Sequence, residues 1–305
     1  MNFLKNYTLE EVSEGIFAAI SKNSGGACSN SGIIDLGDQT IIFDTSFTIQ
    51  AAQELRQIAE QVTKSPITYV INSHWHGDHI RGNMVFKDCS IIASQKTKMK
   101  MDETHPSLLK EHKDSIHQYQ DHVTNLRKKR ELEKGKEEIE TLTDSILQME
   151  EIISTLPEVE YISPSHTFNE GLTIKGSLLT AQLISIGQGH TEDDSILFIP
   201  ERGILFTGDI LVKNTHPYML DGNIFEWLEA LKKISEYPCS HWIPGHGIVA
   251  NKGDLTTLVN YMTETIQLSK QNTDVTLIDI PEPYSRWKGK QAFYSNIEFI
   301  RSQLK

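Results

Sequence analysis

The 305-residue sequence has no long hydrophobic run, few cysteines and no excess of positive charge. No stretch approaches the roughly 20 apolar residues that a membrane-spanning helix needs. The first residues contain no apolar signal core, so we expect no membrane partner and a cytoplasmic location. The three cysteines, Cys28, Cys89 and Cys239, form no CxxC pair. Such scattered cysteines are typical of reduced thiols in the same compartment.

The balance of charge is acidic, with 41 Asp and Glu against 29 Lys and Arg and a formal net charge of −12. Proteins that bind nucleic acid depend on clustered Lys and Arg. The acidic balance therefore argues against a nucleic-acid partner. The hydrophobic fraction of 38% and the charged fraction of 23% are ordinary for a globular protein.

The hydrophobic pattern predicts strands separated by helices, twice over. In the first half we expect strands at 15–20, 32–36, 40–44 and 68–71 and a helix at 48–63. In the second half we expect strands near 172–175, 181–186, 195–199 and 203–206 and helices near 223–236, 253–270 and 290–303. This order favours an α/β protein built from two similar halves.

Between the halves, residues 107–156 have a different pattern. Pro106 is well placed to open a helix, and apolar residues recur at heptad spacing on both sides of Gly135. Pro157 ends the second run, so we expect a helical hairpin with its turn near Gly135. It could pack on its own domain, join two copies into a homodimer or line a substrate cleft. One long bent helix is also compatible with the pattern.

A compact histidine motif follows the strand expected at 68–71. His74, His76, Asp78 and His79 place four potential metal ligands within six residues. In an extended segment His74 and His76 lie on one side, while the other two can point to an adjacent position. Zinc accepts imidazole nitrogen and carboxylate oxygen at about 2.0–2.2 Å. Two metals roughly 3.5–4 Å apart would need further ligands from elsewhere in the chain.

Three later residues supply such ligands. His190, Asp209 and His246 each come at the end of a predicted short strand and beside glycine. Glycine lets the backbone approach a crowded ion closely, and strand ends place ligands on rigid elements. A single histidine beside glycine is more often a turn residue. The full set, in this order, is a specific signal for a metal site.

These motifs resemble the metallo-β-lactamase-fold hydrolase superfamily from about residue 12 to residue 250, apart from the insertion. The resemblance implies an α/β fold, a four-layer αβ/βα sandwich with a metal site at one edge. We therefore expect one domain over residues 1–305 that carries the helical-hairpin insertion at 107–156. Carried over by position, the resemblance implies a first metal on His74, His76 and His190, a second on Asp78, His79 and His246, and Asp209 bridging both.

Segments 189–195 and 206–209 resemble the glyoxalase II-like, lactonase-like and cyclase-like branch of this superfamily. The aspartate at 209 and the missing export signal argue against a dedicated antibiotic-degrading enzyme. The C-terminal tail shows no clear glutathione-binding helical domain, which leaves thioester specificity open.

The chemistry that this resemblance implies is hydrolysis by a dinuclear metal centre. Two zinc ions would lower the pKa of a bridging water, and the hydroxide would attack a carbonyl carbon. Asp78 would hold the second metal and orient the nucleophile or shuttle its proton. We expect a small-molecule ester, lactone, thioester or amide as substrate. Manganese or iron could replace zinc, because nitrogen and oxygen ligands accept several metals.

Two other functions remain open from the sequence. A mononuclear iron persulfide dioxygenase would use His74, His190 and Asp209 alone. A non-enzymatic scaffold would use the metal for stability and the hairpin for a partner.

Residues beside the ligands are candidates for substrate contact. Trp75 lies between two ligands and could line a cleft or pack beneath it, while Lys213, His216 and Tyr218 follow Asp209. The remaining histidines are expected to be solvated: His105, His112, His117, His122, His166 and His241.

Overall fold

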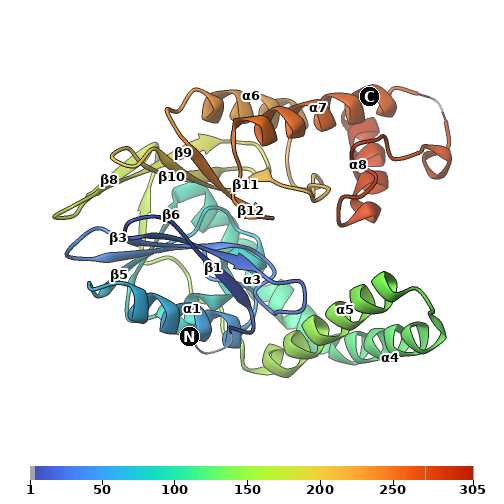
Figure 1. Ribbon diagram of the computed structural model, residues 1–305, viewed down its shortest axis with the longest axis horizontal. Coiled ribbons are helices and arrows are strands. Elements are labelled where there is room, and N and C mark those ends of the chain that lie inside the picture. The colour runs from blue at the N-terminus through green and yellow to red at the C-terminus, as the bar shows by residue number, and fades with distance from the viewer. Residues whose placement is uncertain (1–3, 272, 305) are drawn as a thin grey trace. The chain divides into compact units, whose positions relative to one another are not determined.

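The computed structural model describes residues 4–271 and 273–304 and shows a mixed α/β protein with two sheets (Figure 1). The α/β class expected from the sequence is confirmed. The chain forms two compact units, Met1–Phe168 with Gly176–Leu179 and Asn169–Lys175 with Thr180–Lys305. Among the described residues, no helix combines the length and the apolar character that crossing a membrane requires.

The first unit contains a seven-stranded sheet whose strands follow in chain order. Its strands are β1 (Tyr7–Ser13), β2 (Ile16–Ser21), β3 (Ser31–Asp35), β4 (Thr40–Phe43), β5 (Ile67–Ile71), β6 (Ser90–Ser94) and β7 (His166–Phe168). Strands β1 to β4 pair antiparallel, and β4 to β7 pair parallel. Parallel strands end at one edge, so the segments after β4 and β5 lie together there.

Helix α1 (Ile49–Val62) connects β4 to β5 and lies along one face of this sheet (Figure 1). Thr48 caps its first turn by accepting a hydrogen bond from the Ala51 amide. Its buried face carries Leu55 and Ile58, which belong to the same apolar core as Ile33 and Val70 of the sheet. Alternating strand residues and one helical stripe thus build the core that supports the sheet edge.

Two short helices come after β5, namely α2 (Gly77–Ile80) and the 3₁₀ helix η1 (Arg81–Phe86). The long helix α3 (Gln95–Asp114) comes after β6. The prediction that Pro106 opens a helix is wrong, because Pro106 lies inside α3. The helix begins earlier because the Ser94 hydroxyl accepts a hydrogen bond from the Thr97 amide and caps it.

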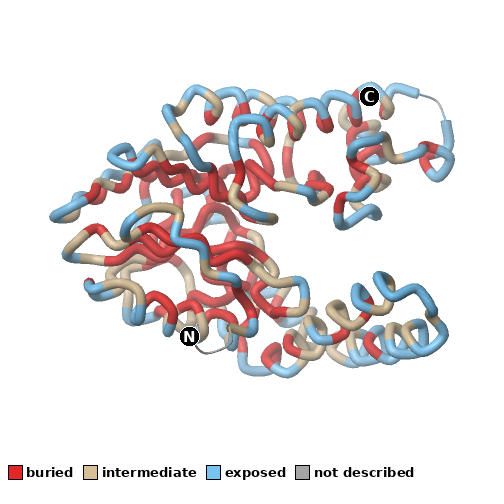
Figure 2. The backbone as a smooth tube through the Cα atoms, viewed as in Figure 1, coloured by how far each residue is buried: buried red, intermediate tan, exposed pale blue. Residues whose placement is uncertain are grey.

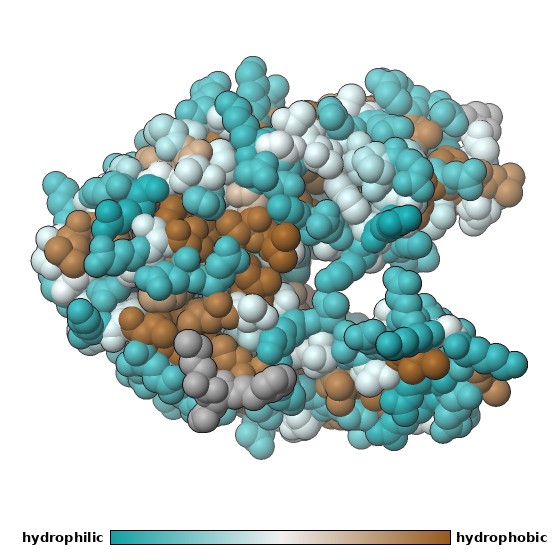
Figure 3. All heavy atoms as spheres, in the orientation of Figure 1, coloured by the Kyte–Doolittle hydropathy of each residue, from teal (hydrophilic) through white to brown (hydrophobic). Residues whose placement is uncertain are grey.

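Residues 107–156, expected to form a helical hairpin, contain the end of α3 and then α4 (Ile116–Leu132) and α5 (Lys136–Thr155), so the hairpin begins at Ile116; the 3₁₀ helix η2 (Leu156–Glu158) follows it. The two helices lie side by side in Figures 1 and 2, so one long bent helix is excluded. Their heptad stripes are buried or half-buried, with Val123, Leu142 and Ile146 most buried. Figure 3 shows mainly hydrophilic side chains on the face of this hairpin turned to the viewer.

A buried carboxylate joins the base of the hairpin to the rest of the first unit. Glu151 of α5 accepts a 2.7 Å hydrogen bond from the Thr48 hydroxyl and forms an ion pair with Lys5. A side chain at Gly26 would place its Cβ only 2.3 Å from the same Glu151 oxygen. The base of the hairpin is therefore packed tightly at this point.

The second unit contains a five-stranded sheet in the order β12-β11-β10-β9-β8. Its strands are β8 (Gly171–Lys175), β9 (Thr180–Gly187), β10 (Asp194–Ile199), β11 (Ile204–Val212) and β12 (His241–His246). Its helices are α6 (Ile224–Ser235), α7 (Lys252–Ser269), η3 (Val275–Leu277) and α8 (Lys290–Gln303). Helices α6 and α7 cover one face of the sheet (Figure 1), with Trp227 fully buried between helix and sheet.

The hairpin can be tested by comparing two adjacent residues of α5. Ile146 is 3% exposed and Leu147 is 45% exposed. We expect Ile146→Ala to lower the free energy of opening of α5 by about 2–4 kcal/mol, because it leaves a cavity between the helices. Hydrogen exchange of the α4 and α5 amides measures this change. Leu147→Ala is the control and should change it by less than about 0.5 kcal/mol; equal effects would contradict the packing described.

Candidate metal centre

The first group of candidate ligands lies directly after the buried end of β5. His74 and His79 are fully buried, and His76 and Asp78 are partly exposed. The rings of His74 and His79 have centroids 4.2 Å apart, and those of His74 and His76 4.8 Å apart. Helix α2 begins at Gly77, so Asp78 and His79 lie in its first turn. Within this unit the imidazoles are therefore gathered in one place.

A buried aspartate that the sequence reasoning missed orients two of these imidazoles. Asp44, the residue after β4, has its Oδ2 2.8 Å from Nδ1 of His79. The same oxygen accepts a 2.8 Å bond from the Ser73 hydroxyl, which lies 2.8 Å from Nδ1 of His74. Both Nδ1 atoms are thus engaged, and Nε2 of each ring is the nitrogen suited to bind a metal.

The electrostatics of Asp44 follow from its position. Burial raises the pKa of the Asp44 carboxyl, and the neighbouring His79 imidazole opposes that rise. The Ser73 amide also donates to Oδ1 at 2.8 Å. The sequence placed Asp44 at the end of a predicted strand, and only the parallel pairing of β4 with β5 in the structure brings it to the sheet edge of the ligand segment.

Polar side chains hold the backbone of the ligand segment. The His79 carbonyl oxygen accepts from the Thr45 amide at 2.9 Å and from the Asn72 side-chain amide at 3.2 Å. Asn72 and Asn83 exchange two hydrogen bonds, of 3.0 and 2.9 Å. All of these groups are buried. Fixed backbone of this kind keeps ligand side chains in place before a metal arrives.

The second group of candidate ligands lies on the sheet of the second unit. Asp209 is within β11, His246 ends β12 and His190 follows β9. Asp209 Oδ2 lies 3.4 Å from His190 Nε2 and 3.2 Å from His246 Nε2. Asp209 and His190 are buried, and His246 is partly exposed.

A glycine makes this approach possible. A Cβ at Gly245 would lie 1.9 Å from Asp209 Oδ1, so any side chain there would displace the carboxylate. Two imidazole nitrogens therefore lie close to one carboxylate. Imidazole nitrogens and carboxylate oxygens are the donors that zinc and related divalent ions prefer, so each unit carries side chains that fit a metal.

The residues predicted to meet a substrate lie in different environments. Trp75 is 9% exposed and packs with Ile80 and Met101. His216 is 3% exposed, lies 3.0 Å by its Nδ1 from the Tyr261 hydroxyl and has an aromatic surround. Burial lowers the pKa of His216 to about 4, which keeps it neutral. His216 is therefore a core residue, and its predicted contact with a substrate is not supported by its position.

The two other candidates lie in the segment after β11, with Lys213 directly after the strand and Tyr218 further along. The Lys213 ammonium donates to Asp254 at 2.9 Å and to the Val249 carbonyl at 3.2 Å. Tyr218 is 47% exposed. Of the four candidates, Tyr218 is the most exposed.

Two of the six histidines expected to be solvated are not. His105 is buried and donates from Nε2 to the Trp75 carbonyl oxygen at 2.5 Å, so that prediction is wrong. His112 is partly buried against Arg81. Both lie on α3, seven residues apart and thus on one face, which turns toward the ligand segment. The prediction is confirmed for the four exposed histidines, His117, His122, His166 and His241.

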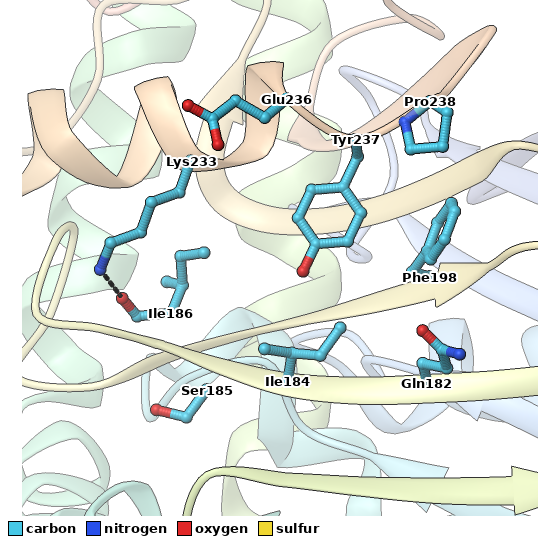
Figure 4. A pocket seen from close by; sticks show the side chains of 9 residues that line it. All are labelled: Gln182, Ile184, Ser185, Ile186, Phe198, Lys233, Glu236, Tyr237 and Pro238. Atoms are coloured by element: carbon cyan, nitrogen blue, oxygen red, sulfur yellow. Dashed lines mark hydrogen bonds between the residues drawn. The ribbon is translucent and has the colours of Figure 1, made fainter.

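A cavity of about 460 Å³ opens in the second unit between α6 and the sheet (Figure 4). The Lys233 ammonium donates to the Ile186 carbonyl oxygen at 3.3 Å across one side of it. Tyr237 and Phe198 form another side. None of the seven candidate ligands lines this cavity, so it is a separate feature from the candidate metal centre.

The role of Asp44 can be tested by substitution. We expect Asp44→Asn to weaken metal binding by roughly 10- to 100-fold, because the amide NH2 would face either the Ser73 amide or the Ser73 hydroxyl and His79, which now donate to carboxylate oxygens. Competition with a zinc-responsive dye measures the affinity. Asp35→Asn is the control, since Asp35 also ends a strand of this sheet but bonds Ser65 away from the histidines. Equal affinities of the two variants would contradict the role given to Asp44.

Comparisons with known proteins bear on this arrangement. The family model described as the metallo-β-lactamase superfamily matches residues 28–246, which is more than half of the chain. A Caenorhabditis elegans protein named beta-lactamase-like protein 2 homolog is 21% identical, over 97% of this chain and 86% of its own length. A Bacillus cereus metallo-β-lactamase type 2 is 22% identical over 75% of this chain and 72% of its own.

Solved structures share the fold. A metallo-β-lactamase from Pontibacter korlensis superposes with a TM-score of 0.61 at 15% identity, covering 84% of this chain and 99% of its own. The metallo-β-lactamase FIM-1 from Pseudomonas aeruginosa, in its mono-zinc form, gives a TM-score of 0.60 at 14% identity, covering 85% and 96%. The family match, with a His and Asp ligand set in sequence order, shows that the chain belongs to the metallo-β-lactamase superfamily.

Proposed function

We propose that this protein is a dinuclear zinc hydrolase that cleaves a small ester, lactone, thioester or amide. The observation that carries the proposal is that candidate ligand side chains are held in place in both units. Asp44 and Ser73 engage Nδ1 of two buried histidines, and Asp209 lies within 3.4 Å of two others. Membership in the metallo-β-lactamase superfamily supports the same reading.

In this proposal the two groups of ligands complete one centre. His74, His76 and His190 would hold the first ion, Asp78, His79 and His246 the second, and Asp209 both. Bound divalent ions supply activation of water and polarisation of a carbonyl oxygen, which is the chemistry of hydrolysis. Zinc is preferred by the histidine-rich set, while manganese or iron would satisfy the same donors.

We assign to Asp78 the role of accepting the proton of the attacking water. Its side chain is 22% exposed, and its Oδ2 lies 3.6 Å from Nε2 of the buried His79. A carboxylate that is partly open to solvent can orient a water molecule and accept its proton. The fully buried Asp44, by contrast, holds imidazoles and has no route to a substrate.

The proposed compartment is the cytoplasm, and the three cysteines, all free thiols, agree with it. Self-association through the α4–α5 hairpin remains a prediction, since the apolar stripes of the two helices pack within the chain.

Metal content tests the proposal through two histidines of one strand. His246 ends β12 and is a proposed ligand, whereas His241 begins β12 and is exposed. We expect two zinc ions per chain in the wild type and in His241→Ala, and no more than one in His246→Ala, because one ligand of the second ion is lost. Elemental analysis after zinc reconstitution measures the content, and hydrolysis of an ester, lactone, thioester and amide panel should fall with it.

Other outcomes would favour another function. One iron per chain, with oxygen consumed and sulfite formed, would identify a persulfide dioxygenase. Fewer than one metal in the wild type, or equal metal content in both variants, would overturn the proposed centre. Full metal content with no hydrolysis across the panel would favour the non-enzymatic scaffold, which uses the metal for stability.

A further inference from the structure

Arg81 is a buried cation that immediately follows the ligand segment. It begins η1, two residues after His79, and is only 7% exposed. Charged side chains are rarely buried to this degree unless an opposite charge pairs with them. Within the described residues, no carboxylate oxygen lies within 4.0 Å of its guanidinium nitrogens. The fold thus buries a positive charge without an ion-pair partner.

Three neighbours hold the guanidinium in one orientation. Its Cζ lies 4.0 Å from the centre of the Phe47 ring, a cation–π distance. Its Nη2 donates to Nδ1 of His112 at 2.5 Å. On the other side it rests against Gly77, where an added Cβ would lie 3.0 Å from Nε. The group therefore packs on the backbone between two proposed ligands, His76 and Asp78.

This packing leaves one edge of the guanidinium available. Of its five N–H groups, one points to His112, and the Nε–H is sealed from solvent without an acceptor. Nη1 has no hydrogen bond to any described residue and, unlike Nε, is not sealed. The terminal edge therefore retains three N–H donors. A planar edge of this kind matches the two oxygens of a carboxylate.

The charges near Arg81 favour an added anion. The ionisable groups that interact with its charge are Asp78, Tyr119, Cys28, His112 and His105, and burial, the largest cause, lowers the pKa of His105 to about 4. Burial raises the pKa of the Cys28 thiol far above neutral pH, so it carries no charge. His112 is also neutral, because burial and the Arg81 charge lower its pKa. Asp78 is then the one negative charge among these groups, and the proposed second metal would offset it.

We propose that Arg81, held by His112 and Phe47, binds a carboxylate of the substrate beside the metal centre. This inference rests on the proposed function and narrows it. The substrate is then an ester, lactone, thioester or amide that also carries a carboxylate, held by the arginine while its carbonyl meets the metals. His112 acts as a positioning residue from α3.

The test compares succinate with its neutral diamide, succinamide, as ligands of the zinc-loaded full-length chain. We expect calorimetry to show that Arg81→Gln weakens succinate binding by roughly 10- to 100-fold, the range for a hydrogen bond between charged groups, and leaves succinamide unaffected. Arg56→Gln is the matched control, because Arg56 belongs to the same unit but pairs with Asp88 at 2.7 Å on the surface. Zinc content is measured in each variant.

Hydrolysis gives the second arm, with monoethyl succinate and diethyl succinate differing by one carboxylate. The wild type should prefer the monoester in kcat/KM by roughly tenfold or more, and Arg81→Gln should remove that preference. If Arg81→Gln does not fold, Arg81→Lys, which keeps the charge but not the planar edge, should show a smaller loss of succinate affinity.

Unchanged succinate binding in both Arg81 variants would overturn the inference, as would equal losses for succinate and succinamide. Arginine-dependent succinate binding without hydrolysis anywhere in the ester, lactone, thioester and amide panel would instead retain the carboxylate site and reject the proposed hydrolase. The two failures are therefore distinguishable.

Discussion

The proposed chemistry of the first unit depends on the hydrogen bonds that the buried Asp44 carboxylate makes with Ser73 and His79. This carboxylate joins the end of β4 to the ligand segment after β5 through Ser73 and His79. Because β4 and β5 are parallel, both segments leave the sheet at one edge and can meet. A buried carboxylate would be costly without partners, and here the ligand segment provides them. The same bonds therefore stabilise the fold and orient the imidazoles.

The second unit reaches a similar result with fewer side chains. Asp209 has the two histidines within 3.4 Å, and the absence of a side chain at Gly245 keeps its carboxylate in place. Strand pairing between β11 and β12 is irregular at Gly208, directly before Asp209. In the second unit the space left by a glycine accommodates the candidate ligands, whereas in the first unit hydrogen bonds position them.

Helix α3 shows how a helix outside the ligand segment can act on a site built by other elements. His105 bonds the Trp75 carbonyl, and His112 bonds Arg81, so one face of the helix contacts both ends of the ligand segment. The sequence alone gave these histidines no distinctive spacing, which is why they were expected in solvent. Their burial depends on packing between elements far apart in sequence, and local pattern does not encode that packing.

Local patterns determined much of this protein. Helices α6, α7 and α8 lie within about two residues of the predicted ranges, because amphipathic periodicity defines them and Asn223 and Asn251 cap the first two. The ligand motif at 74–79 was also evident, since its donors are close together in the chain. Tertiary structure alone decided the role of Asp44, the core position of His216 and the burial of Arg81 without a carboxylate. Each of these depends on which distant side chain lies opposite, and only the folded chain fixes that.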